Sequence, residues 1–123
     1  MFDKILIANR GEIACRIART CARLGVAAAG VHSAADAEAL HVKAIGESIA
    51  IGGAAASDSY LRIDAVIEAA KITGAQAIHP GFGFLAENAA FARAVEAAGL
   101  VFIGPAPDVI ERLGDKALAK QEA

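Results

Sequence analysis

One stretch of the chain, residues 77–88 (AIHPGFGFLAEN), combines several residue types that can take part in chemistry. It places a histidine, a carboxylate, two aromatic rings, a proline and two glycines between a strand-like run and a helix-like run. Glycine lets the backbone adopt positive φ angles or approach another group closely, and α/β proteins bind ligands in loops that follow parallel strands. The alternative is a Pro-Gly turn that reverses the chain while Phe82 and Phe84 fill the core. The whole stretch together favours a functional loop. Its candidate residues are His79, Gly81, Phe82, Gly83 and Phe84.

The first apolar run leads into residues 8–14 (ANRGEIA), where dinucleotide-binding proteins carry their phosphate loop. This stretch has one glycine, whereas the G-x-G-x-x-G fingerprint needs three for the turn, the phosphate approach and helix packing. Arg10 and Glu12 would also crowd a pyrophosphate. NAD or FAD binding is therefore not expected. The stretch is either a tight strand-to-helix turn capped by Asn9 or, because Arg-Gly-Glu faces the crevice, a place with a more specific role.

Other polar residues match known site patterns poorly. Arg16, Arg19 and Arg23 recur at helical spacing as one basic stripe, which is either solvated or part of a subunit interface. Asp36, after the second apolar run, is expected to cap a helix rather than to bind a ribose. The three histidines have no carboxylate or cysteine beside them at metal-ligand spacing. Residues 114–116 (GDK) lack the glycine-rich lead of a P-loop, and no Ser-His-Asp arrangement is recognisable.

Short apolar runs alternate with amphipathic stretches along the chain, which indicates repeated strand–helix units. We expect strands at residues 4–8, 26–31, 48–51, 76–79 and 100–103, and helices at residues 12–24, 36–44, 59–73, 88–98 and 107–113, with a further helical segment at 115–123. Gly25, Gly74 and Gly99 follow three of these helices, as helix C-terminal caps do. The pattern predicts an α/β fold, a Rossmann-like doubly wound parallel sheet of about five strands.

The composition is that of one globular domain, with 123 residues of which 56% are hydrophobic and 21% charged. The net charge of -2 gives no electrostatic reason to expect nucleic acid or an anionic membrane as a partner. Cys15 and Cys21 do not form a CxxC pair and are expected to be small buried thiols. No apolar run reaches the length of a signal peptide or a membrane span, so we expect a soluble, cytoplasmic protein.

Six blocks of sequence together resemble the biotin carboxylases. They are residues 5–14 (ILIANRGEIA), 32–36 (HSAAD), 59–61 (SYL), 77–88 (AIHPGFGFLAEN), 102–105 (FIGP) and 114–116 (GDK). The blocks come in the order and at the spacing of that family and cover essentially the whole chain. The family includes the biotin carboxylase subunits of acetyl-, propionyl- and methylcrotonyl-CoA carboxylases, and also pyruvate and urea carboxylases. Residues 13–17 (IACRI) are more similar to its acyl-CoA and urea branches.

The resemblance implies a ligase that carboxylates biotin with ATP and bicarbonate, the first half-reaction of an acyl-CoA carboxylase. It implies ATP, Mg²⁺ and carrier-bound biotin as ligands, with a biotin carboxyl carrier domain and a carboxyltransferase subunit as partners. In such enzymes the residue matching Lys116 contacts ATP. The loop from His79 to Phe84 lines the crevice near bicarbonate and biotin, and the helix with Arg16 and Arg19 lies at the interface of a homodimer.

The chain also departs from that family. Phe82 stands where a tyrosine is usual, Ala86 replaces a usual serine, and Arg23 occupies an often acidic position. Because members are several times longer, the resemblance assigns residues 1–113 to the N-terminal domain that precedes the ATP-grasp region, and 114–123 to the start of the connection. The magnesium-binding carboxylates, the bicarbonate-binding base and the catalytic arginine of the family match nothing in this chain. We therefore expect no catalytic residue within it, weak ATP binding and no carboxylation by the chain alone.

Two other functions stay open at this level. One is a stand-alone module that binds a nucleotide or a small anion, which would need a complete phosphate cradle. Protection by NAD or ATP in a thermal-shift assay would favour it. The other is a non-enzymatic module that pairs with a full-length subunit through the helix with Arg16 and Arg19, and co-purification with an intact carboxylase would favour that one.

Overall fold

The computed structural model describes residues 2–104. The elements in chain order are β1 (Lys4–Ile7), α1 (Gly11–Arg23), β2 (Ala27–His32), the 3-10 turn η1 (Ala34–Asp36), α2 (Leu40–Ile45), β3 (Ser48–Ala50), the 3-10 turn η2 (Ala56–Asp58), α3 (Ile63–Thr73), β4 (Ala77–His79), α4 (Ala89–Ala97) and β5 (Val101–Phe102). Within residues 2–104, none of the helices has both the length and the apolar character needed to cross a membrane. The helical segments predicted at 107–113 and 115–123 lie outside the described residues.

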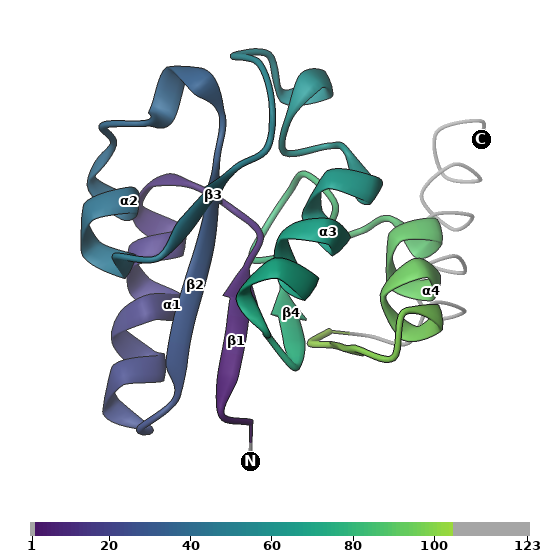
Figure 1. The fold of residues 1–123 in the computed structure, drawn as a ribbon, viewed down its shortest axis with the longest axis horizontal. Coiled ribbons are helices and arrows are strands. Elements are labelled where there is room, and N and C mark those ends of the chain that lie inside the picture. Colours follow the sequence, from purple (N-terminus) through teal and green to yellow (C-terminus); the bar gives the residue numbers. More distant parts are fainter. Residues whose placement is uncertain (1, 105–123) are drawn as a thin grey trace, which may run out of the picture.

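The five strands form one parallel sheet in the order β3-β2-β1-β4-β5 (Figure 1). The chain runs outward from β1 to β3 and then returns to β4 on the other side of β1. The topological switch point of the sheet therefore lies between β1 and β4. In open α/β sheets, ligands bind beyond the carboxyl ends of the strands at this point.

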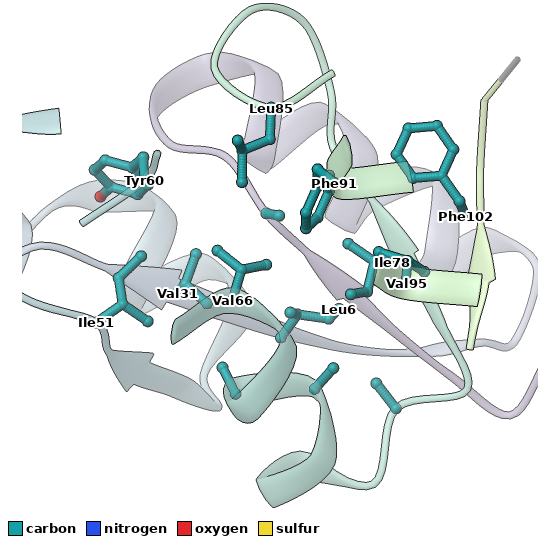
Figure 2. Packing of buried hydrophobic residues seen from close by; sticks show 14 of the residues in the cluster. Leu6, Val31, Ile51, Tyr60, Val66, Ile78, Leu85, Phe91, Val95 and Phe102 are labelled. Atoms are coloured by element: carbon teal, nitrogen blue, oxygen red, sulfur yellow. The ribbon is translucent and has the colours of Figure 1, made fainter. Parts of the chain in front are cut away.

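The side chains of β1 alternate between two cores, one on each face of the sheet. Leu6 lies in the larger core with Val66 of α3 and Phe91 of α4 (Figure 2). Ile5, the residue before it, lies in the smaller core with Cys21 of α1. Helices therefore cover both faces of the sheet, which confirms the predicted Rossmann-like doubly wound fold.

The two cysteines are buried free thiols on α1, as predicted. Burial raises the pKa of the Cys21 thiol. A thiol with a raised pKa stays protonated near neutral pH, so Cys21 acts as a small packing residue rather than as a nucleophile.

Two predicted helices are shorter in the structure. The helix expected at residues 59–73 begins at Ile63, because the Ser59 hydroxyl donates to the carbonyl of Ala55 at 3.0 Å and closes a turn before it. The helix expected at residues 36–44 is divided into η1 and α2, with residues 37–39 between them. In both places the side chains in question, Ser59 and Asp36, make hydrogen bonds with other parts of the chain, and the backbone there is not α-helical.

Candidate functional site

Two loops meet at the switch point of the sheet. One is the turn from β1 into α1, and the other is the predicted functional loop, residues 79–84, which we call the crevice loop. The Ala8 N–H donates to the His79 carbonyl at 2.9 Å and joins the two at their base. An open hollow of about 430 Å³ lies between them, lined by residues 9–13 and 82–84. The predicted loop thus borders the position where sheets of this topology bind ligands.

Asn9 ties the crevice loop to the turn after β1. Its side chain is buried, and its Nδ2 donates to the carbonyls of Pro80 at 2.8 Å and Phe82 at 2.7 Å. Its Oδ1 accepts from the Arg10 N–H at 2.8 Å. The interpretation of Asn9 as a helix cap is therefore wrong, since the N-cap of α1 is Arg10, without a side-chain cap bond. The Asn9 amide instead fixes the backbone on both sides of Gly81.

The two glycines of the crevice loop differ in their surroundings. Gly81 and Gly83 have φ angles of 67° and 70°, which favour glycine. A Cβ on Gly81 would lie 2.8 Å from Asn9 Nδ2 and 2.9 Å from Ile13 Cγ2, whereas one on Gly83 would meet nothing within 4 Å. Phe82 is 75% exposed, whereas Phe84 packs against the larger core, so the alternative in which both rings fill the core is right for Phe84 and wrong for Phe82. Gly81 thus lets the loop approach Asn9 closely, whereas at Gly83 only the positive φ angle favours glycine.

A second polar network surrounds Asp36. Arg10 donates to it in a bidentate pair, from Nε to Oδ2 at 2.7 Å and from Nη2 to Oδ1 at 3.0 Å. The Tyr60 hydroxyl donates to Oδ2 at 2.7 Å and accepts from the Ser33 N–H at 3.2 Å. The interpretation of Asp36 as a helix cap is wrong, because the N-cap of α2 is Ala39. The carboxylate instead joins the segments that follow β1 and β2 to the segment that precedes α3.

This network keeps Asp36 ionised. The hydrogen bond from the Arg10 guanidinium, and after it that from Tyr60, hold the pKa of the carboxyl well below its ordinary range despite desolvation. A depressed folded-state pKa stabilises the fold above the unfolded pKa of about 3.9, and this contribution is lost as the pH falls through the folded value. The network is therefore fully formed at neutral pH and weakens only in acid.

Tyr60 provides a direct readout of this network, because the chain has one tyrosine and no tryptophan. Burial first, and then the hydrogen bond to Asp36, raise the pKa of its phenol. We expect one tyrosinate transition in the ultraviolet absorbance, with a midpoint above the ordinary value of about 10. Since the folded pKa is the higher one, the stability from Tyr60 is full below the unfolded pKa and is lost as the pH rises through the folded pKa.

The same titration of the Asp36→Asn variant checks the cause. Removing the negative charge is expected to lower the Tyr60 midpoint, while burial still keeps it above the ordinary value. A wild-type midpoint at the ordinary value would contradict the buried, carboxylate-bound position of the phenol.

His79 closes the base of the crevice loop. Its Nδ1 accepts from the Gly81 N–H at 3.1 Å, which places the ring proton on Nε2, and burial lowers its pKa. His79 also borders a groove of about 340 Å³ that runs along α1 and is lined mainly by apolar residues such as Ile5, Ile13 and Ile17. A neutral histidine in this position orients the loop and does not supply a positive charge.

The basic stripe lies on the exposed side of α1. Arg16, Arg19 and Arg23 are all exposed, as the helical spacing predicts. Arg19 Nη2 lies 2.9 Å from Glu12 Oε1, and Arg16 also borders the groove beside α1. This arrangement is compatible with both alternatives, a solvated face and an interface.

The residues expected to hold the nucleotide are not among those described. Within residues 2–104, no group of three or more His, Cys, Asp or Glu could hold a metal ion. Lys116, the expected ATP contact, lies outside the described residues. The described part of the chain therefore does not fit a magnesium site. Its candidate site consists of the crevice loop and the side chains that hold this loop in place.

Sequence reasoning found the crevice loop and missed its supports. The sequence predicts helix caps at Asn9 and Asp36 and a helix that includes Tyr60. A signal was present for Asn9, since a polar residue directly after a fully apolar strand has to find partners at the buried edge of the sheet. Asp36 and Tyr60 lie in two of the blocks that carry the family resemblance, residues 32–36 and 59–61, but no local pattern shows that the two side chains contact each other.

An all-parallel, doubly wound sheet whose switch point carries a glycine loop held by a buried asparagine is an architecture in which many α/β proteins bind ligands. The family model described as "Biotin carboxylase, N-terminal domain" matches residues 1–110, and the chain belongs to this family. The resemblance seen in the sequence is thereby confirmed.

Individual relatives agree with the family model. The biotin carboxylase of Pseudomonas aeruginosa is 56% identical over 120 residues, which are 98% of this chain and 27% of that protein. The mitochondrial propionyl-CoA carboxylase alpha chain of Homo sapiens is 53% identical over 119 residues, 97% of this chain and 16% of that protein. The chain thus spans about a quarter or less of these relatives.

Solved structures match the fold closely. The biotin carboxylase domain of a thermophilic 2-oxoglutarate carboxylase, bound to ADP, has a TM-score of 0.91 and 48% identity, covering 98% of this chain and 27% of that one. The urea carboxylase of Kluyveromyces lactis has a TM-score of 0.90 and 49% identity, covering 92% of this chain and 10% of that one.

Proposed function

We propose that this domain forms one wall of a biotin carboxylase active site, in a ligase that uses ATP and bicarbonate to carboxylate biotin on a carrier domain. The observation that carries the proposal is the crevice loop, which lies at the switch point of the sheet and is held there by Asn9. Its residues are those for which the resemblance implies a place near bicarbonate and biotin. Membership of the family supports this assignment.

The described residues suit a binding role rather than a catalytic one. Phe82 presents an exposed aromatic ring, and Gly83 next to it carries no side chain that would block a ligand. A flat apolar ring beside an unobstructed backbone suits a small, uncharged bicyclic group such as biotin. Because the usual tyrosine hydroxyl is absent at Phe82, the contact made here is that of the ring.

The remaining parts of the reaction are assigned to other residues. We propose that Lys116 contacts the phosphates of ATP, since a lysine ammonium suits a phosphate as a point charge. When bound, ATP with Mg²⁺ supplies the phosphoryl group that activates bicarbonate. A carrier domain and a carboxyltransferase subunit are the proposed partners, and the acyl-CoA branch is the proposed setting.

A chimeric enzyme tests this function with the residues of this chain. Residues 1–110 would replace the matching part of the Pseudomonas aeruginosa biotin carboxylase. We expect the chimera to release ADP in a bicarbonate- and biotin-dependent manner at a rate within about tenfold of the parent, a change of about 1.4 kcal/mol in the barrier. A chimera that unfolds as cooperatively as the parent but releases no biotin-dependent ADP would refute the proposal.

The exposed stripe on α1 favours a second, compatible role as a subunit interface. Arg16 and Arg19 extend from the helix that the resemblance places between the two copies of a homodimer. Exposed charges of one sign commonly steer association and set its specificity. Co-purification with an intact carboxylase subunit, lost in Arg16→Glu with Arg19→Glu, would support this role, and retention in the double variant would oppose it.

A further inference from the structure

The crevice loop contains a backbone conformation that needs support. Phe84 has a φ angle of 47°, and among residues 2–104 it is the non-glycine residue with a positive φ. The left-handed region is unfavourable for a residue with a Cβ atom, so it persists only where the surroundings hold it. The contacts of the Phe84 side chain are therefore those that decide whether the loop keeps this shape.

Phe84 packs against the larger core, and its ring contact there is with Tyr60. The two rings are stacked, with centroids 5.1 Å apart and planes at 21°. Tyr60 is itself 3% exposed and lies at the edge of the larger core (Figure 2). Its hydroxyl is fixed by Asp36, which Arg10 holds in turn through two hydrogen bonds. The Tyr60 ring therefore cannot move away from Phe84 without breaking the polar network at its hydroxyl end.

The loop is thus held at three places. Asn9 holds the carbonyls of Pro80 and Phe82, His79 accepts from the Gly81 N–H, and Tyr60 contacts the ring of Phe84. Phe82 is 75% exposed and lines the hollow between the two loops. Because its ring is not buried, its orientation depends on how the backbone on either side of it is held.

We propose that Tyr60 is the positioning residue of the crevice loop, whose ring, held by Asp36 and Arg10, fixes Phe84 and thereby directs Phe82 into the crevice. The Asn9 clamp sets where the loop lies, and Tyr60 sets how its exposed ring is presented. The consequence for biotin binding rests on the proposed function, whereas the effect of Tyr60 on the order of the loop backbone is independent of that function.

The loop is tested in the 123-residue chain by ¹⁵N relaxation of the backbone amides at residues 81–85. Tyr60→Leu removes the stacked ring, and we expect the order parameters to fall from about 0.85 to below about 0.6. Tyr60→Phe keeps the ring and loses the anchor, so we expect a smaller fall at the same residues. Leu61→Ala is the control, since this neighbour on the other side of Tyr60 is 43% exposed and has no ring on Phe84.

Native order parameters in both Tyr60 variants would overturn the inference, and so would an equal fall along β1 and β4. If Tyr60→Leu fails to fold, Tyr60→Phe alone tests the inference: lower order parameters at residues 81–85 would support it, and native values would overturn it.

Steady-state kinetics of the full-length polypeptide that contains this domain distinguish a role of Tyr60 in biotin binding from a role in loop order alone. We expect Tyr60→Leu to raise the KM for biotin about tenfold with an unchanged KM for MgATP, and Leu61→Ala to change neither. A loosened loop with an unchanged KM for biotin would refute the role of Tyr60 in binding. Lack of carboxylation by the unsubstituted polypeptide would refute the proposed function and leave the loop result standing.

Discussion

Replacing Asp36 by alanine is expected to lower the free energy of unfolding by about 3 kcal/mol, the cost of removing one partner from a well-formed network of charged hydrogen bonds. The carboxylate accepts hydrogen bonds from Arg10, Tyr60 and the Ser33 hydroxyl, and 12% of its side chain is exposed. Without it, the buried Tyr60 hydroxyl loses its acceptor. Urea unfolding at neutral pH, followed by circular dichroism, measures the change.

Asp64→Ala is the control for this prediction. Asp64 also pairs with an arginine, Arg62 at 3.1 Å, but 78% of its side chain is exposed. Exposed ion pairs add little to stability, so we expect a change close to the error of the measurement. Equal effects of the two substitutions would mean that Asp36 stabilises nothing beyond a surface pair.

Replacing Gly81 by alanine is expected to destabilise the domain by about 3 kcal/mol, combining a left-handed backbone cost of 1–2 kcal/mol with the loss of about two hydrogen bonds. The new Cβ would lie 2.8 Å from Asn9 Nδ2, so the Asn9 amide has to move and release the carbonyls of Pro80 and Phe82. The same urea titration measures the loss.

Gly83→Ala separates the cost of a left-handed backbone from the cost of displacing neighbouring side chains. Gly83 has a φ of 70° and open space at the Cβ position, so only the backbone cost of about 1–2 kcal/mol applies. The difference between the two variants is the cost of displacing Asn9 and Ile13 from the added Cβ atom at position 81. Equal losses would show that Asn9 does not confine Gly81.

The fold could be predicted because its determinants are local in sequence. Apolar runs and glycines that end helices mark most elements, and Gly74 has the left-handed φ of 74° expected of a C-cap. The predictions were wrong where a side chain makes a long-range contact instead. Ser59 and Tyr60 lie in a turn and Asp36 in a network, although their local sequence favours a helix in both places.

The crevice loop could be predicted because its residues are not those that a core requires. Its anchors could not, because their partners are distant in sequence. Asn9 binds residues 71 and 73 positions away, and Asp36 binds partners 26 and 24 positions away. The Asn9 contacts depend on the pairing of β4 with β1, and the Arg10–Asp36 pair depends on the pairing of β2 with β1. The order of the strands could not be derived from the local sequence pattern.

The most direct test of the central claim is the transfer of radiolabelled bicarbonate to biotin by the polypeptide that carries this domain at its full genetic length. We expect label on biotin that depends on MgATP, that is strongly reduced in Gly81→Ala, and that is unchanged in Leu61→Ala. Cleavage of ATP without label on biotin, or transfer that is unaffected by Gly81→Ala, would contradict the account.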